Sequence, residues 1–144
     1  MIQGLTNAGA LPTLERLVQF TGVRHKVLTN NIANLSTPYF IPGDLSVDDF
    51  QASLRNAIDR RRSRPDAAYA PLAVRDTRDV SFRDGRIEAT PQPANENIMF
   101  HDRNNRDLER TMQGLAENTM AHNAGIELLR NQFDMLKLAI RERV

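Results

Sequence analysis

The chain has no cysteine and no tryptophan, and it has only three histidines in 144 residues. The missing cysteine excludes thiol catalysis, disulfides and cysteine zinc sites. His25, His101 and His122 show no HxxxH or HExxH spacing, and there is no glycine-rich phosphate loop. We therefore expect no catalytic, cofactor-binding or metal-binding residues, and the sequence favours a protein that is not an enzyme.

Long apolar runs are also missing. No window approaches the roughly 18 apolar residues of a membrane span. The N-terminus has no Lys or Arg before Arg16 and no apolar run of signal-peptide length, so we expect no cleaved secretion signal. Aromatic residues make up only 6% of the chain, which favours a helical assembly with small cores over a sandwich or barrel. The net charge of +1 does not indicate a nucleic-acid partner.

What is present is helical spacing at the two chain ends. The first such stretch begins near Pro12, a residue that a first helical turn tolerates. Pro38 disfavours helical geometry at Thr37 and supplies a stop. The positions that recur at helical spacing between these points are Leu14, Leu17, Val18, Thr21, His25, Leu28, Ile32 and Leu35. They predict a helix with a single apolar face.

The last stretch of the chain carries the longest periodic pattern. Its positions follow alternating steps of four and three, and they are Leu108, Met112, Leu115, Thr119, His122, Ile126, Leu129, Phe133, Leu136 and Ile140. A sustained seam of this kind is typical of supercoiled helices. Met120, together with Ala121, Leu128 and Met135 at sevenfold spacing, indicates a second apolar edge, which a helix needs only if it contacts more than one neighbour.

We therefore predict a mainly α fold in which the terminal helices form a coiled-coil-like hairpin, with residues 1–41 and 104–144 together as one domain. Residues 42–103 hold most of the prolines and form a weakly ordered central segment. It is expected to contain a short helix, begun by a capping-box pattern from Ser46 to Asp49, and a β-hairpin turning at Asp84-Gly85. We expect residues 60–103 to be mobile or ordered only by partners.

A cluster of arginines follows the predicted short helix, and two interpretations of it are open. Its members are Arg55, Arg60, Arg61, Arg62 and Arg64. The cluster could bind nucleic acid, anionic lipid or an acidic protein surface, or it could be a solvated helix end where cations favour the helix dipole. No aromatic residues are interleaved for stacking on bases, which favours a solvated or protein-contacting role.

The stretch NNIANLSTPYF resembles the N-terminal signature of the flagellar axial proteins, the rod and hook family. The residues that carry the resemblance are Asn30, Asn31, Ile32, Ala33, Asn34, Thr37 and Pro38. Residues 104–144 are similar to a proximal rod member of that family. The chain departs from the family pattern at Tyr39, where Gly is usual, and at Leu35-Ser36, where Ala-Asp is common. Tyr resists the positive backbone angles that Gly accepts.

The resemblance implies a structural subunit of the proximal rod of the bacterial flagellar basal body. It implies export by the flagellar type III apparatus without a cleaved signal peptide, and assembly through the terminal helices into a rod that spans the periplasm. It also implies self-association and contacts with other rod subunits such as FlgC, with the basal adaptor FliE and with the export apparatus. The alternative is a soluble helical adaptor that binds one partner by helix-in-groove packing.

The residues expected to pack in the hairpin and in assembly are Leu14, Leu17, Leu28, Ile32, Leu108, Met112, Leu115, Ile126, Leu129, Phe133, Leu136 and Ile140. If the helices run antiparallel with Leu14 near Leu138, the three asparagines fall near residues 118–122. There the seam turns polar at Thr119 and His122, so these residues would fix the register. The alternative is that the asparagines only cap the helix end.

Overall fold

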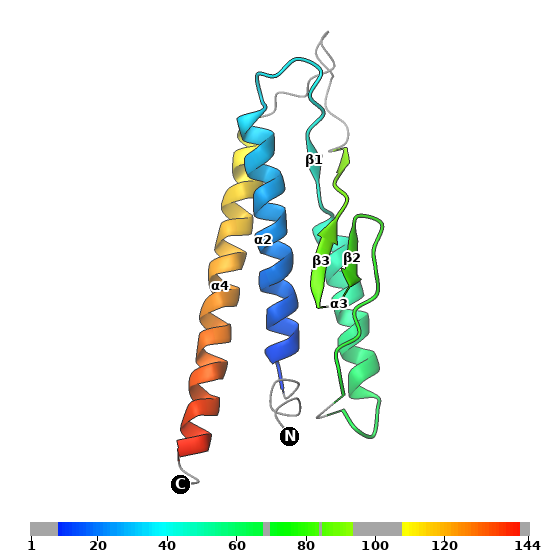
Figure 1. The fold of residues 1–144 in the computed structure, drawn as a ribbon, viewed down its shortest axis with the longest axis vertical. Helices are drawn as coiled ribbons and strands as arrows, with labels where there is room; N and C mark the ends of the chain where they lie inside the picture. Colours follow the sequence, from blue (N-terminus) through cyan, green and yellow to red (C-terminus); the bar gives the residue numbers. More distant parts are fainter. Residues whose placement is uncertain (1–8, 68–69, 84, 94–107, 142–144) are drawn as a thin grey trace.

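The computed structural model describes residues 9–67, 70–83, 85–93 and 108–141. Its elements are α2 (Leu11–Ala33), β1 (Gly43–Asp44), α3 (Val47–Arg62), β2 (Val80–Arg83), β3 (Arg86–Ala89), β4 (Gln92–Pro93) and α4 (Leu108–Arg141). The two longest helices run antiparallel along an elongated molecule (Figure 1). The predicted mainly α fold, with packed terminal helices, a central short helix and small strand pairs, is confirmed.

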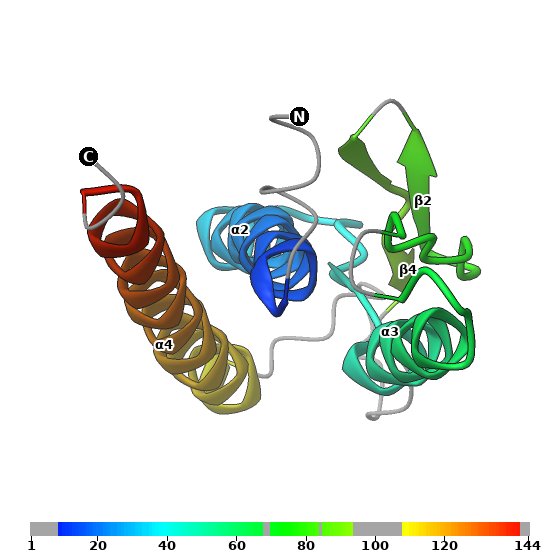
Figure 2. The same cartoon turned by 90° about the horizontal axis from the view of Figure 1, so that it is seen from below.

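Helix α2 lies in the middle of the molecule. Seen end-on, α4 covers one side of it, and α3 with the strands covers the other (Figure 2). Pro12 stands in the first turn of α2, as predicted, and Asn34 is the C-cap, so the helix ends before Pro38. Because α2 has neighbours on both sides, the prediction of a single apolar face was wrong.

The core lies between α2 and the central segment. Its buried members are Phe20, Leu45, Phe50 and Val80. The rings of Phe20 and Phe50 are parallel to within 2°, with centroids 4.0 Å apart. This stack packs the short helix against the long one.

Helix α3 and the hairpin form where the sequence predicted them. The Ser46 side chain accepts a hydrogen bond from the Asp49 amide (3.1 Å), which caps α3. Strand β2 pairs antiparallel with β3, and Gly85 in the turn has φ +77°. Strand β1 pairs with β4.

The loop before β2 is packed as well. Ala70, Leu72 and Asp79 are buried, and Asp79 accepts hydrogen bonds from the Ser46 amide and from the Thr77 hydroxyl. The expectation that residues 60–103 take their order only from partners is therefore corrected for 70–83 and 85–93, which pack within the chain. Residues 94–103 lie outside the described residues.

Candidate assembly interface

A polar cluster joins α2 to α4 near the middle of α2. The Asn118 side-chain amide donates to the Thr21 carbonyl (2.8 Å), and His122 Nδ1 is hydrogen-bonded to Thr21 Oγ (2.8 Å). Asn118 and Thr21 are each only 3% exposed. Sliding one helix along the other would leave a buried amide without a partner, so this cluster fixes the register.

The observed register differs from the predicted one. Gly125 faces Leu17 and Val18. Counting four residues back from Val18 and four forward from Gly125 places Leu14 near Leu129, not near Leu138. The prediction was wrong because it aligned the helix ends, whereas the contacts are set by Thr21 and by a glycine in the middle of α4. Of the two residues predicted to fix the register, His122 bonds across to α2, and Thr119 donates to Leu115 in its own helix (2.7 Å).

Gly125 permits a close approach of the two helices. A Cβ atom at this position would lie 3.1 Å from Val18 Cγ2 and 3.5 Å from Leu17 Cδ2. Glycine inside a helix costs about 0.5–1 kcal/mol relative to alanine, so its presence needs a packing reason, and this contact supplies one. The backbones of α2 and α4 can therefore approach each other more closely here than a larger residue at position 125 would allow.

We expect Gly125→Leu to lower the free energy of unfolding by about 1–3 kcal/mol, because the added side chain overpacks the contact with Leu17 and Val18. Urea unfolding, monitored by circular dichroism, measures the change in the free energy of unfolding. Gly114→Ala is the matched control, since the nearest atom to its Cβ would be Arg24 Nη2 at 3.9 Å. The control should be neutral or stabilising, and equal effects of the two changes would refute the close-approach account.

The residues of the predicted α4 seam are divided between two environments. Leu115, Thr119, His122, Ile126, Leu129 and Leu136 are half-buried, whereas Leu108, Met112, Phe133 and Ile140 are exposed. On α2, Leu28 is buried, Leu14, Leu17 and Ile32 are half-buried, and His25 is exposed. The helix α4 is rotated so that its two fully buried residues are Asn118 and Gly125, which the seam did not include.

Helix α4 therefore exposes a large amount of apolar side chain. We call these residues the α4 surface, and they are Leu108, Met112, Met120, Leu128, Phe133, Met135, Leu138 and Ile140. Each is at least 40% exposed, and Met120 reaches 68%. In the part of the chain that the structure describes, the other exposed large apolar side chains are Tyr39 and Ile41. Exposed apolar area of this extent marks an interaction site.

The asparagines of the signature organise the turn after α2. Asn31 is buried, and its side chain donates to the Gly43 carbonyl (2.6 Å) and accepts from the Gly43 amide (3.2 Å). Asn34 caps the helix, with its side chain donating to the Asn30 carbonyl (2.9 Å), and the Thr37 amide donates to the Asn34 carbonyl (2.9 Å). The prediction that they lie near residues 118–122 was wrong.

The Arg24 guanidinium completes this turn from the preceding part of α2. Its Nε donates to Asp44 Oδ1 (2.8 Å) and its Nη2 to Asp44 Oδ2 (2.6 Å). The pair is bidentate and largely shielded on the arginine side, which makes it stronger than an ordinary surface pair. Together with Asn31, it fixes β1 against α2, and so it sets where the chain turns back.

The chain is 27% identical to the flagellar basal body rod protein FlgB of Bacillus subtilis (strain 168) over 133 residues, which cover 92% of this chain and 94% of the relative. Along almost its whole length, the chain is similar to FlgB. No family model and no solved structure matches it. The resemblance to the rod and hook family is thereby confirmed, and because 133 of 144 residues are matched, the similarity to FlgB includes the central segment as well as both ends.

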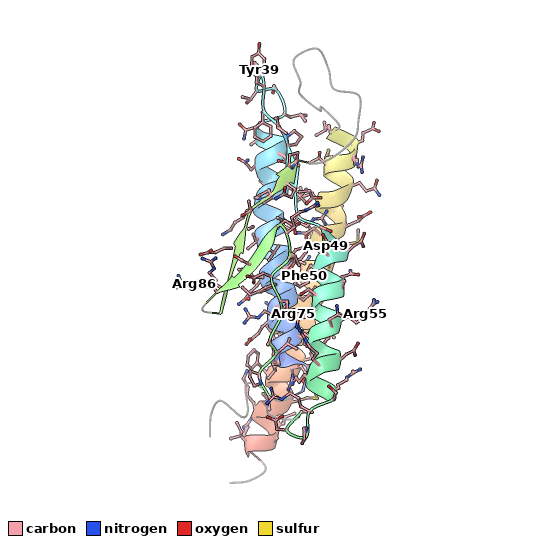
Figure 3. The ribbon with its side chains drawn as sticks, turned by 90° about the vertical axis from the view of Figure 1, so that its right-hand side faces the viewer. Tyr39, Asp49, Phe50, Arg55, Arg75 and Arg86 are labelled. Atoms are coloured by element: carbon pink, nitrogen blue, oxygen red, sulfur yellow. The ribbon has the colours of Figure 1, made fainter. Side chains whose placement is uncertain are left out.

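The departure of the chain from the rod and hook signature at Tyr39 has a structural cost. Tyr39 occupies the position where Gly is usual, and its φ is 62°, in the left-handed region. A residue with a side chain pays roughly 1–2 kcal/mol there. The side chain is 75% exposed, and it projects from the end of the molecule (Figure 3). Little contact within the chain therefore offsets the backbone strain.

We expect Tyr39→Gly to raise the free energy of unfolding by about 0.5–1 kcal/mol, because it relieves the strain but adds freedom to the unfolded chain. Thermal or urea unfolding of the purified chain tests this. Tyr39→Ala is the matched control, since it removes the ring but keeps a Cβ at positive φ. A loss of stability in Tyr39→Gly would contradict the strain argument.

The arginine cluster is mostly a structural feature of the end of α3. Arg61 is buried and donates to the Gly9 carbonyl (3.2 Å) and the Ala67 carbonyl (3.0 Å), which corrects its interpretation as part of a solvated helix end. Arg60 donates to the Ala73 carbonyl (3.1 Å). On the surface, the hydrogen bond from Arg64 lowers the pKa of Asp66, and such exposed pairs contribute little.

Metal sites and membrane spans are two other functional features that a helical chain can carry. No group of three or more histidine, aspartate or glutamate side chains in the described ranges is placed to hold a metal ion. No helix in the same residues is long and apolar enough to cross a membrane. Within this part of the chain, the α4 surface is the most extensive exposed apolar feature, and it calls for a partner.

Proposed function

We propose that the chain is a structural subunit of the bacterial flagellar rod, assembled through its terminal helices. The observation that carries the proposal is the α4 surface, a set of exposed apolar side chains on several sides of a helix of 34 residues. Similarity to FlgB along almost the whole chain supports the rod as the place where this surface is covered. The terminal-helix domain, residues 1–41 with 104–144, is the assembling part in this proposal.

The directions in which α4 exposes apolar side chains favour a rod subunit over an adaptor. Phe133 follows Met120 by thirteen residues, so the two lie about 140° apart around a helix that turns about 100° per residue. Leu128 lies on a third direction. An adaptor that lays one helix into one groove buries a single face. A subunit with neighbours on several sides buries all three.

The proposal extends to location and partners. The chain leaves the cytoplasm through the flagellar type III apparatus without a cleaved signal peptide, and it joins the rod in the periplasm. Its neighbours are other copies of itself, rod subunits such as FlgC, and the adaptor FliE at the base. The mostly half-buried contacts between α2 and α4 suit a chain that is unfolded for export.

Deletion of the gene in the source bacterium tests the function. We expect the deletion strain to be non-motile and to lack complete hook–basal bodies, because the rod cannot be built without this subunit. A plasmid copy should restore both, and the purified basal bodies should then contain the chain. Motile deletion cells with normal basal bodies would overturn the proposal.

A further inference from the structure

The described part of the chain contains three methionines, and all of them lie exposed on α4. Met112, Met120 and Met135 are 56%, 68% and 54% exposed. Met120 follows the buried Asn118 by two residues, so it lies about 200° around the helix from that contact with α2. Met112 and Met135 lie on either side of Met120, about 80° and 60° from it by the same count. The three thioethers are therefore spread over the side of α4 that faces away from α2.

An exposed thioether is a reactive group in this chain. A peroxide transfers one oxygen atom to the methionine sulfur, which becomes a sulfoxide, and the peroxide leaves as water. The chain has no cysteine, so no thiol of its own competes for the oxidant. Among the described residues, the side chains most readily oxidised are therefore the three methionines of the α4 surface.

The sulfoxide has different consequences in the free chain and in an assembly. In the free chain the new S=O group lies in water, and the contacts that join α4 to α2 are made by Asn118, His122 and Gly125 instead. Against the apolar surface of a neighbouring subunit, the same group is buried without a hydrogen-bond donor. Each such group weakens association by about tenfold. The change is reversible, because methionine sulfoxide reductases remove the oxygen.

We propose that Met112, Met120 and Met135 form an oxidation-sensitive site that controls assembly. A peroxide converts them to sulfoxides in the free chain, and the oxidised chain does not join the rod until it is reduced. This inference rests on the proposed rod function and deepens it by naming a regulation of the α4 surface. Leucine has a helix propensity similar to that of methionine and a similar volume, so it would supply the same apolar contact without the reactivity.

Peroxide oxidation followed by peptide mass spectrometry tests the site. The purified full chain and isolated hook–basal bodies receive the same hydrogen peroxide treatment, with a free methionine peptide as the reference. In the free chain, we expect each of the three methionines to gain one oxygen at a rate within about threefold of the reference, and the helical circular dichroism to persist. In the basal bodies the three rates should be at least about tenfold lower. Equal rates in the two preparations, or loss of the helical signal in the oxidised chain, would overturn the proposal.

A second arm tests the block to assembly with variants expressed in the deletion strain. Glutamine at positions 112, 120 and 135 places a polar group of similar length where the sulfoxide would be, and leucine at the same three positions is the matched control. We expect the glutamine chain to be at least about tenfold less abundant than the leucine chain in purified basal bodies. Both purified chains should have the same helical circular dichroism. Equal abundance of the two chains, or unfolding of the glutamine chain alone, would contradict the proposal.

The outcome is separable from that of the rod proposal. If deletion of the gene abolishes the rod while the glutamine and leucine chains assemble equally, the oxidation control is wrong and the function stands. If deletion leaves motility intact, the function is wrong whatever the peroxide rates show.

Discussion

Replacing Phe50 with alanine is expected to lower the free energy of unfolding by about 3–5 kcal/mol. Phe50 is 1% exposed and stacks on Phe20 at a centroid distance of 4.0 Å, so the change leaves a cavity between α2 and α3. The second ring contact of Phe50, with Phe82 of β2 at 6.5 Å, is lost as well. The strands and α3 should then separate from α2 at lower urea concentration than α4 does.

The measurement is urea unfolding with amide exchange read separately for the central segment and for α4. Phe50→Leu is the matched control, since it keeps most of the buried volume and should cost much less. A loss below about 1 kcal/mol for Phe50→Ala would mean that the central segment does not depend on this core, in conflict with the large cost of deleting a buried ring.

Replacing Met120 and Leu128 together with glutamate is expected to abolish rod assembly and motility while leaving the folded monomer intact. Both side chains are more than half exposed in the monomer, so the carboxylates cost little there. In the proposed rod they meet apolar surface of neighbouring subunits, where an unpaired buried charge costs several kcal/mol.

Motility on soft agar and the circular dichroism of the purified variant are the two readouts. The matched control places the same two added charges on α3, as Gln51→Glu with Asn56→Glu, both exposed in the structure. The control should swim normally. Normal swimming of the Met120→Glu, Leu128→Glu strain would mean that this side of α4 faces solvent in the assembly.

The sequence alone was sufficient to predict the elements that form through contacts between neighbouring residues. Ser46 and Asp49 meet within one turn of α3, and Gly85 turns a hairpin of four-residue strands. Both depend on neighbouring residues, so the pattern alone predicts them. The length of α4 followed from its periodic apolar positions for the same reason.

The rotation and register of α4 depend on contacts that no periodic pattern contains. The predicted seam consisted mainly of large apolar residues. In the structure, the closest packing is at Gly125 and the buried amide is Asn118. Small and hydrogen-bonded residues lie at the contact because they let two backbones approach. Phe20 was missed for a related reason. It lies beside the predicted apolar face of α2, and a second face is visible only when the central segment is known to pack there.

The role of Asn31 also lies beyond local patterns. Its side chain pairs with both backbone groups of Gly43, twelve residues away, and this contact exists only when the chain has turned back along α2. The sequence offered a helix cap or a register lock between helices. Asn34 does cap the helix. The register between the helices is instead fixed by Thr21, Asn118 and His122.

A density map of the isolated rod at side-chain detail is the most direct test of the account. We expect the map to show antiparallel α2 and α4 with His122 beside Thr21. We also expect it to show Met120 and Leu128 packed against neighbouring subunits. A map in which this chain is present with the α4 surface facing solvent, or is missing from the rod altogether, would contradict the claim that the chain assembles through α4.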